Sequence, residues 1–319
     1  MITPFESRWA SAHRLYSNNP QRVLSVDGSV ETWSRQLTRM EDIPVEIAAL
    51  MEGRFDGLPY CVRSPAVHND SISEPESFLF LEGSRLAVAK RSLAGVTLFQ
   101  ADLADIDAVE TETALLHSVL TIVPRDGRPE RIPFNSVVED LFAPVVEAYL
   151  RERGGIEGRD GEAESCAGLL ERDFKYYVHA RGVLGANEPK ALFYHPTEAV
   201  PELFHGSRVI PSYLVAAMGS MVVCFSEGQP FRSRGKAGNS MVVRYLPRSA
   251  GYAIGSLPVR GESRYRTMVL RSGSVLLELP LARSAQAEFE AFAQAANLPE
   301  LAVDRLQVSD GAAWRSKVG

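Results

Sequence analysis

Basic residues gather in the last third of the chain, with a spacing that could hold an anion. Between Gln229 and Arg271 the sequence has nine basic residues and one acidic residue, a net charge of +8. Guanidinium and ammonium groups beside flexible Gly and Ser suit a phosphate group, because they offer several charge-assisted donors. The alternative is a solvated basic face, or one that docks against an acidic surface. The residues expected to bind an anion are Arg232, Arg234, Lys236, Arg244 and Arg264.

Three histidines, His179, His195 and His205, lie in one region and could form a catalytic or metal site. Imidazole can act as a general base or as a metal ligand. No two of these residues have the His-x-x-x-His spacing, and no acidic partner is obvious. We therefore expect ordinary structural histidines, with no catalytic residue, no metal and no cofactor. An enzyme with a distributed site around them stays open as an alternative.

Acidic residues form a second charged segment. Carboxylates at alternate positions share one face of a strand and could hold a metal ion. The segment lacks the glycine spacing of a calcium loop, so we expect a solvated strand face. The surrounding stretch, Phe99–Phe142, has nine acidic residues and three arginines, a net charge of −6. The five carboxylates are Asp102, Asp105, Asp107, Glu110 and Glu112.

Known catalytic and nucleotide-binding motifs are missing from the sequence. Gly228–Lys236 superficially resembles a phosphate loop, but its glycines are seven apart. Ala237 also stands where Ser or Thr would bind magnesium. Because sites often assemble from distant residues, this absence does not exclude an enzyme.

The charged segments belong to a stretch that occurs twice. A shift of 147 residues places Val243–Ala296 over Val96–Tyr149 without a gap. Each copy predicts a strand, a hairpin turn at Asp126-Gly127 or Ser272-Gly273, a second strand and a helix. The pattern predicts an internal duplication.

Each copy needs further strands, because two strands and one helix cannot bury both of their faces. Phe78–Leu81 and Leu86–Ala89 flank a Glu82-Gly83 turn and predict a hairpin, and Val222–Phe225 begins its counterpart. Short strands in series, closed by one C-terminal amphipathic helix, resemble the bacterial pleckstrin-homology-like (PH-like) fold. The resemblance covers about residues 75–150 and 208–296.

The PH-like resemblance implies an α+β fold that is mainly antiparallel β. It implies two curved sheets or barrels, each closed by a C-terminal helix, in addition to a helical N-terminal extension. The family has no shared catalytic residues. In some PH domains the loop after the first strand binds a phosphorylated headgroup, and Phe231–Lys236 lies in a comparable loop.

Composition changes along the chain predict five segments. They are an N-terminal helical or mixed extension at 1–65, module one at 66–152, a flexible linker at 153–169, module two at 170–298 and a tail at 299–319. The linker is rich in Gly and poor in apolar residues. In the extension we expect helices at Ser29–Met40 and Ile43–Met51, and we expect module two to open with a strand at Phe174–His179.

The totals indicate a globular protein of the reducing cytoplasm. The 319 residues are 45% hydrophobic and 23% charged, and the net charge of −6 argues against a general nucleic-acid binder. There is no run of 18 apolar residues and no signal peptide, which predicts no transmembrane segment. The three cysteines are widely spaced, as is typical of a reducing compartment.

These features favour a non-catalytic cytoplasmic binding or scaffold protein. It would recognise a protein or peptide partner through a sheet edge or the groove beside a helix. The alternative is a binder of an anionic ligand, either a phosphorylated headgroup or a nucleic acid, through the basic 229–271 face. The sequence leaves open a homodimer, and docking of the acidic module on the basic one.

Overall fold

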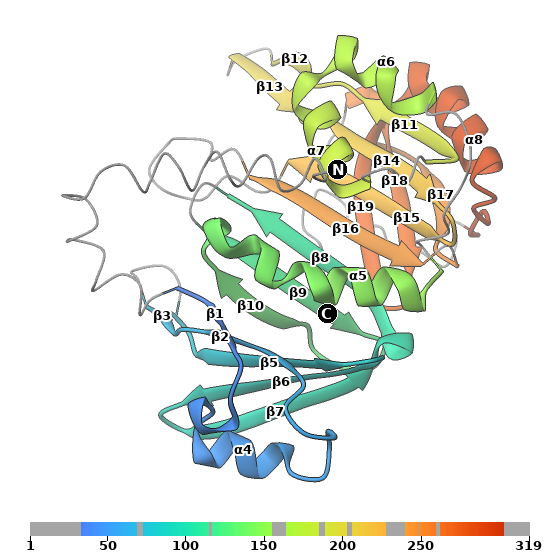
Figure 1. Cartoon of the computed structure of the whole chain (residues 1–319). Helices are drawn as coiled ribbons and strands as arrows, with labels where there is room; N and C mark the ends of the chain where they lie inside the picture. The colour runs from blue at the N-terminus through green and yellow to red at the C-terminus, as the bar shows by residue number, and fades with distance from the viewer. Residues whose placement is uncertain are drawn as a thin grey trace.

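The computed structural model describes residues 33–68, 73–114, 117–154, 164–184, 189–202, 206–227, 240–247, 249–259 and 262–302. Most of these residues form antiparallel strands, and a few helices pack on the sheets (Figure 1). The expectation of an α+β fold that is mainly antiparallel β is therefore confirmed. The expectation of barrels is wrong, because every sheet among the described residues is open.

A five-stranded sheet contains the first strands of the chain, in the spatial order β1-β2-β5-β6-β7. One of its faces is covered by α4 (Val45–Met51), whose buried Ile47 packs in a cluster with Phe78 and Phe80. The sheet strands are β1 (Arg35–Leu37), β2 (Tyr60–Ser64), β5 (Glu76–Glu82), β6 (Arg85–Ser92) and β7 (Gly95–Asp102). A 3-10 helix, η1 (Met40–Asp42), precedes α4, and a small hairpin joins β3 (Val67–His68) to β4 (Ser73–Glu74).

The N-terminal part of this sheet corrects one expectation and confirms another. The helix expected at Ser29–Met40 is wrong for Arg35–Leu37, which is extended and pairs with β2. Burial of Leu37 in the cluster below the sheet favours the strand over the local helical spacing. The helix expected at Ile43–Met51 is confirmed as α4.

A seven-stranded sheet combines strands from both predicted modules, in the order β10-β9-β8-β16-β15-β14-β11. Module one supplies β8 (Ile106–Thr113), β9 (Ser118–Pro124) and β10 (Glu130–Phe134). Module two supplies β11 (Ala191–His195), β14 (Tyr213–Met218), β15 (Met221–Glu227) and β16 (Met241–Pro247). The two groups join where β8 pairs antiparallel with β16, a contact that we call the seam.

A three-stranded sheet follows the seven-stranded one, and its strands are β17 (Gly251–Val259), β18 (Glu262–Ser272) and β19 (Val275–Ala282). It leads through a 3-10 helix, η4 (Arg283–Ala285), into α8 (Gln286–Ala295). A separate hairpin pairs β12 (Glu198–Glu202) with β13 (Gly206–Ile210).

Two 3-10 helices and three α-helices lie between β7 and β11 in the sequence. The 3-10 helices η2 (Leu103–Asp105) and η3 (Ser136–Leu141) flank the strands of module one. The α-helices are α5 (Ala143–Glu152), α6 (Glu164–Arg172) and α7 (Phe174–Leu184).

The strand expected at Phe174–His179 is wrong, because this segment is the start of α7. Asp173 caps the helix by accepting hydrogen bonds from the backbone N–H groups of Lys175 and Tyr176. In addition, α6 begins inside the range expected to be linker, and its Leu169 is buried in the core.

Both faces of the seven-stranded sheet are buried along β14, β15 and β16. One face packs against α5, α6 and α7, and the other packs against β17–β19 and α8. This double burial explains why Tyr213–Phe225 is an almost continuous apolar run instead of an alternating one. Among the described residues, no helix has the length and apolar character needed to cross a bilayer.

The hairpin turns confirm the local reading of the sequence. Turns at Glu82-Gly83, Asp126-Gly127 and Ser272-Gly273 join β5 to β6, β9 to β10 and β18 to β19. In all three turns the glycine has a positive φ, a backbone conformation that other residues rarely adopt.

Candidate functional site

The structure describes two of the five residues expected to bind an anion. Arg244 lies in β16 and Arg264 lies in β18, where it is exposed. The other three, Arg232, Arg234 and Lys236, lie outside the described residues.

Arg244 lies at the seam and contacts an acidic residue of module one. It stands directly opposite Glu110 of β8, and its Nε lies 2.6 Å from Glu110 Oε2. Its Nη1 also donates a hydrogen bond to Ser226 Oγ, at 2.9 Å. The Arg244 side chain is only 11% exposed and that of Glu110 only 18%. The guanidinium of Arg244 therefore joins the two modules and is not directed at an external anion.

Two other carboxylates of the acidic segment, those of Glu112 and Asp107, are also shielded from solvent. The pKa of Glu112 is raised by burial and then by the neighbouring charge of Glu110. Asp107 is buried at a β-bulge, because the pairing of β8 with β9 shifts between Ile106 and Ala108. A bulge turns its extra residue out of the regular alternation of side chains. The expected solvated strand face is therefore wrong for Asp107.

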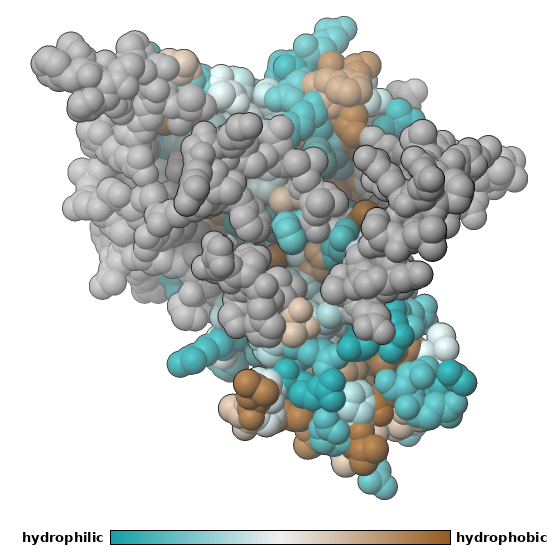
Figure 2. All heavy atoms as spheres, turned by 90° about the vertical axis from the view of Figure 1, so that its left-hand side faces the viewer, coloured by the Kyte–Doolittle hydropathy of each residue, from teal (hydrophilic) through white to brown (hydrophobic). Residues whose placement is uncertain are grey.

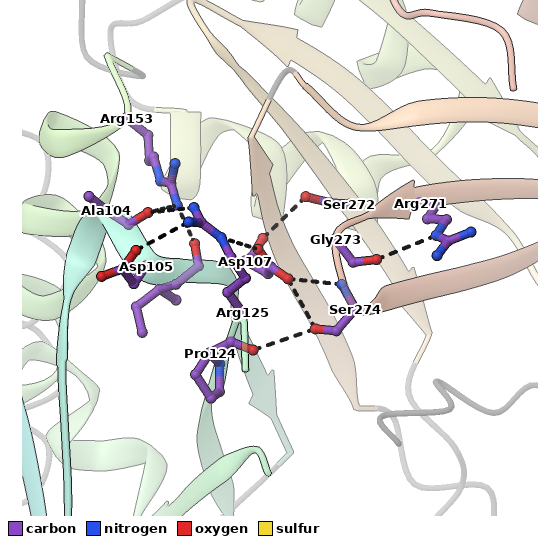
Figure 3. A network of polar contacts seen from close by, with 11 residues as sticks. Ala104, Asp105, Asp107, Pro124, Arg125, Arg153, Arg271, Ser272, Gly273 and Ser274 are labelled. Atoms are coloured by element: carbon purple, nitrogen blue, oxygen red, sulfur yellow. Dashed lines mark hydrogen bonds and ion pairs between the residues drawn. The ribbon is translucent and has the colours of Figure 1, made fainter. Parts of the chain in front are cut away.

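The β18–β19 turn, in the second half of the internal repeat, docks on Asp107 (Figure 3). Its Oδ2 accepts hydrogen bonds from the backbone N–H of Ser274 at 2.8 Å and from Ser274 Oγ at 3.1 Å. Ser272 Oγ donates to the backbone carbonyl of Asp107 at 3.4 Å. A Cβ on Gly273 would lie 1.9 Å from Asp107 Oδ2, so only glycine fits at this position of the turn. This turn forms a second, polar contact between the modules.

Arg125 of module one and Arg153, the first residue of the expected linker, complete the network in Figure 3. Arg153, which follows α5, donates through Nη2 to the carbonyl oxygens of Ala104 and Ile106 at 2.7 and 2.6 Å. Arg125 lies 3.3 Å from Asp105 Oδ1 and 3.9 Å from Asp107 Oδ1. These contacts hold the backbone immediately before the bulge. We interpret the network as a structural junction, because each of its hydrogen bonds and ion pairs joins two groups of the chain.

His195, at the end of β11, is a buried structural residue. Its Nδ1 lies 2.9 Å from the carbonyl oxygen of Pro196, and its Nε2 lies 3.3 Å from the backbone N–H of Ala282. The neutral tautomer with its proton on Nδ1 satisfies both contacts, since Nδ1 then donates and Nε2 accepts. The ring stacks on Tyr213 with centroids 5.0 Å apart, and burial lowers its pKa.

The other two histidines give no support to a distributed site. His179 lies in α7, and His205 lies outside the described residues. Within the described ranges, no three His, Cys, Asp or Glu side chains are grouped as a metal site requires.

One edge of the three-stranded sheet is covered by the chain itself. The backbone N–H of Tyr252 in β17 donates to Pro299 O at 2.9 Å, and the N–H of Leu301 donates to Tyr252 O at 2.7 Å. Asn297, at φ 51°, turns the chain back after α8 so that Pro299–Leu301 can run beside β17. Gly251 makes room for this segment, because a Cβ there would lie 2.5 Å from Leu301 Cδ2.

No segment among the described residues covers the outer edge of the five-stranded sheet in this way. β7 pairs with β6 through eight residues without a register shift, and no other described strand pairs with it. Its apolar side chains are half-buried on both faces, with Val96 and Leu98 beside the α4 cluster and Phe99 and Ala101 beside the main core. With respect to the described residues, β7 therefore offers unpaired outward backbone groups and apolar surface to an added strand.

Sequence reasoning missed the residues that define these contacts. Asp107 and Ser274 are 167 residues apart, and no local pattern relates them. Gly273 was identified only as a turn residue. The cap residue Asp173 carried a usable signal, because Asp is favoured immediately before a helix.

In comparisons with known proteins, no family model and no curated protein matches the chain.

Proposed function

We propose that this chain is a non-catalytic cytoplasmic binding protein of two PH-like modules, which recognises an extended segment of a partner protein at β7. One observation carries the proposal: β7 is a long and regular edge strand without a described neighbour on its outer side. Adding a peptide strand to such an edge is a common mode of recognition, in which backbone hydrogen bonds supply affinity and side-chain contacts supply specificity.

The order of the elements supports the PH-like part of the proposal. In each half, four strands of one sheet are followed by three more strands and by a helix. In the first half the order is β2, which precedes the expected start of module one, then β5, β6, β7, then β8, β9, β10, then α5, with the β3–β4 hairpin inserted after β2. In module two it is β11, β14, β15, β16, then β17, β18, β19, then α8.

The repeat supports the choice of β7 as the binding edge. A shift of 147 residues lays β16 over the position of β7, so the two strands are counterparts in the repeat. β16 accepts β8 as an antiparallel neighbour through five residue pairs. A strand at this position in the fold can therefore accept a further strand, and in module one the position is unfilled by any described strand.

The described side chains that could act in catalysis are buried or engaged within the chain, which supports a binding role over a catalytic one. His195 has both ring nitrogens engaged, and Arg244 is paired with Glu110. The thiols of Cys61 and Cys224 are buried, and burial raises the pKa of each to about 12, which makes them poor nucleophiles. None of these groups is poised to react with a substrate.

The proposal is tested with peptides selected from a random library displayed on phage. We expect the selected peptides to bind in an extended conformation, so that their alternate amides point toward β7. Two N-methylated versions of one peptide, with methyl groups on the even or the odd amides, provide matched probes. One version should lose binding and the other should keep it. Equal binding of both versions would show that β7 does not recognise backbone, and would overturn the proposal.

A further inference from the structure

Within the part of the chain that the structure describes, β7 has none of the devices that normally protect an edge strand. Natural proteins blunt such edges with Pro, Lys, bulges or a covering segment, because free backbone groups invite pairing with another chain. β17 has three of these devices: Pro258, a register irregularity between Ile254 and Val259, and the covering segment Pro299–Leu301. β7 has no Pro, no Lys and no irregularity in its pairing with β6. Its edge is thus left ready to pair.

Resting on the proposed role of β7, we propose that its occupant is a second copy of this chain, which pairs its own β7 antiparallel across a two-fold axis. The pairing continues an arrangement that the chain already uses, because the β7 counterpart β16 meets β8 in the same edge-to-edge manner. Two five-stranded sheets then form one continuous sheet. Such an interface is isologous, with the same residues contributed by both copies.

The sequence of β7 is compatible with this self-pairing. A two-fold axis perpendicular to the sheet keeps equivalent side chains on the same face, so the axis must fall on a residue, at Leu98 or Phe99. With the axis at Leu98, Val96 lies opposite Gln100 and Thr97 lies opposite Phe99. The one charged residue of β7, Asp102, then lies beyond the opposite end of the partner strand. No like charges meet, and the half-buried apolar side chains on both faces are covered.

The elements around β7 are compatible with a second copy as its occupant. α4 packs beside β7 on one face of the sheet, and the two-fold axis places both copies of α4 on that same face. Val45 of α4 is 82% exposed and Met40 of η1 is 46% exposed. Figure 2 shows hydrophobic patches between hydrophilic ones at the lower end of the molecule, the end where Figure 1 places α4 and β5–β7. A neighbouring copy of α4 would cover such apolar side chains.

The test is analytical ultracentrifugation of the full chain from about 1 to about 200 µM, a range in which small interfaces dissociate. We expect a monomer–dimer equilibrium in this range. Thr97→Lys places a positive charge from each copy near the axis and should raise the dissociation constant by at least about tenfold. Thr97→Ser is the matched control and should leave it unchanged. Val45→Asp, which lies outside the strand, should also weaken the dimer.

A chain that stays monomeric at every concentration would overturn the self-pairing, as would a dimer that neither Thr97→Lys nor Val45→Asp weakens. Far-ultraviolet circular dichroism shows whether each variant keeps its fold. The result is separable from that of the peptide experiment, which is done at concentrations where the chain is monomeric. Peptide binding without dimerisation leaves the proposed function standing and removes the self-pairing.

Discussion

Replacing Gly273 with alanine tests the polar junction between the two modules. Gly273 has a φ of +54°, and the new Cβ would lie 1.9 Å from Asp107 Oδ2. The turn must then move away from the bulge, which breaks the two hydrogen bonds from Ser274 to the buried carboxylate. Each hydrogen bond to a charged group contributes about 1.5–3 kcal/mol, and alanine in the left-handed region costs about 1 kcal/mol.

These contributions add up to about 4–7 kcal/mol, and partial rehydration of Asp107 offsets part of the sum, so we expect Gly273→Ala to lower the free energy of unfolding by roughly 3–5 kcal/mol. Gly83→Ala is the matched control, because Gly83 has a φ of +59° and open space around its Cβ position. It should lower the free energy of unfolding by about 1 kcal/mol, the cost of backbone strain alone.

Urea denaturation followed by circular dichroism measures both variants. If Gly273→Ala costs no more than Gly83→Ala, the turn does not dock on Asp107, and the account of the junction is wrong. A further check is the pair Asp107→Asn and Ser274→Ala, whose effects should not be additive, because they remove the same contacts.

Three further predictions concern other contacts. Arg244→Met should lower the free energy of unfolding by about 2–4 kcal/mol, because it leaves Glu110 buried without its partner. Adding Glu110→Leu should recover most of this loss. Strict additivity of the two effects would contradict the pairing. Because burial holds the pKa of folded His195 below the ordinary 6.5, the unfolded chain takes up a proton first as the pH falls. The contribution of His195 to stability is therefore complete above about pH 6.5 and is lost below it. In His195→Gln, the free energy of unfolding in urea should depend less on pH in that range. An unchanged slope of this free energy against pH would refute the reasoning. Gly251→Val should displace Leu301 from β17 and speed limited proteolysis after α8, whereas an unchanged cleavage rate would mean that the segment is not held there.

Local signals in the sequence were sufficient for the hairpins and the closing helices. The glycines of the Asp126-Gly127 and Ser272-Gly273 turns mark the position where each strand must reverse, and the change of period marks the helix that follows. Such features depend on a few neighbouring residues. The structure therefore reproduces them even though the two copies differ in most of their side chains.

Features that depend on distant residues could not be predicted. The seam joins Arg244 to Glu110, and the charges of both residues were visible, but nothing local fixes which edges of two sheets will meet. Phe174–His179 is rich in aromatic and β-branched residues, yet it is helical because Asp173 caps it and Tyr176 is buried. The open edge of β7 is a property of the assembled sheet, so no sequence pattern identifies it.

The most direct test of the central claim is hydrogen exchange of backbone amides at residue resolution, with and without a bound selected peptide. The account predicts that the peptide slows exchange at alternate amides of Gly95–Asp102, because only every second N–H of an edge strand points away from its neighbour. Amides of β17 should exchange at the same rate in both samples. Protection elsewhere in the chain, with β7 unchanged, would contradict the account.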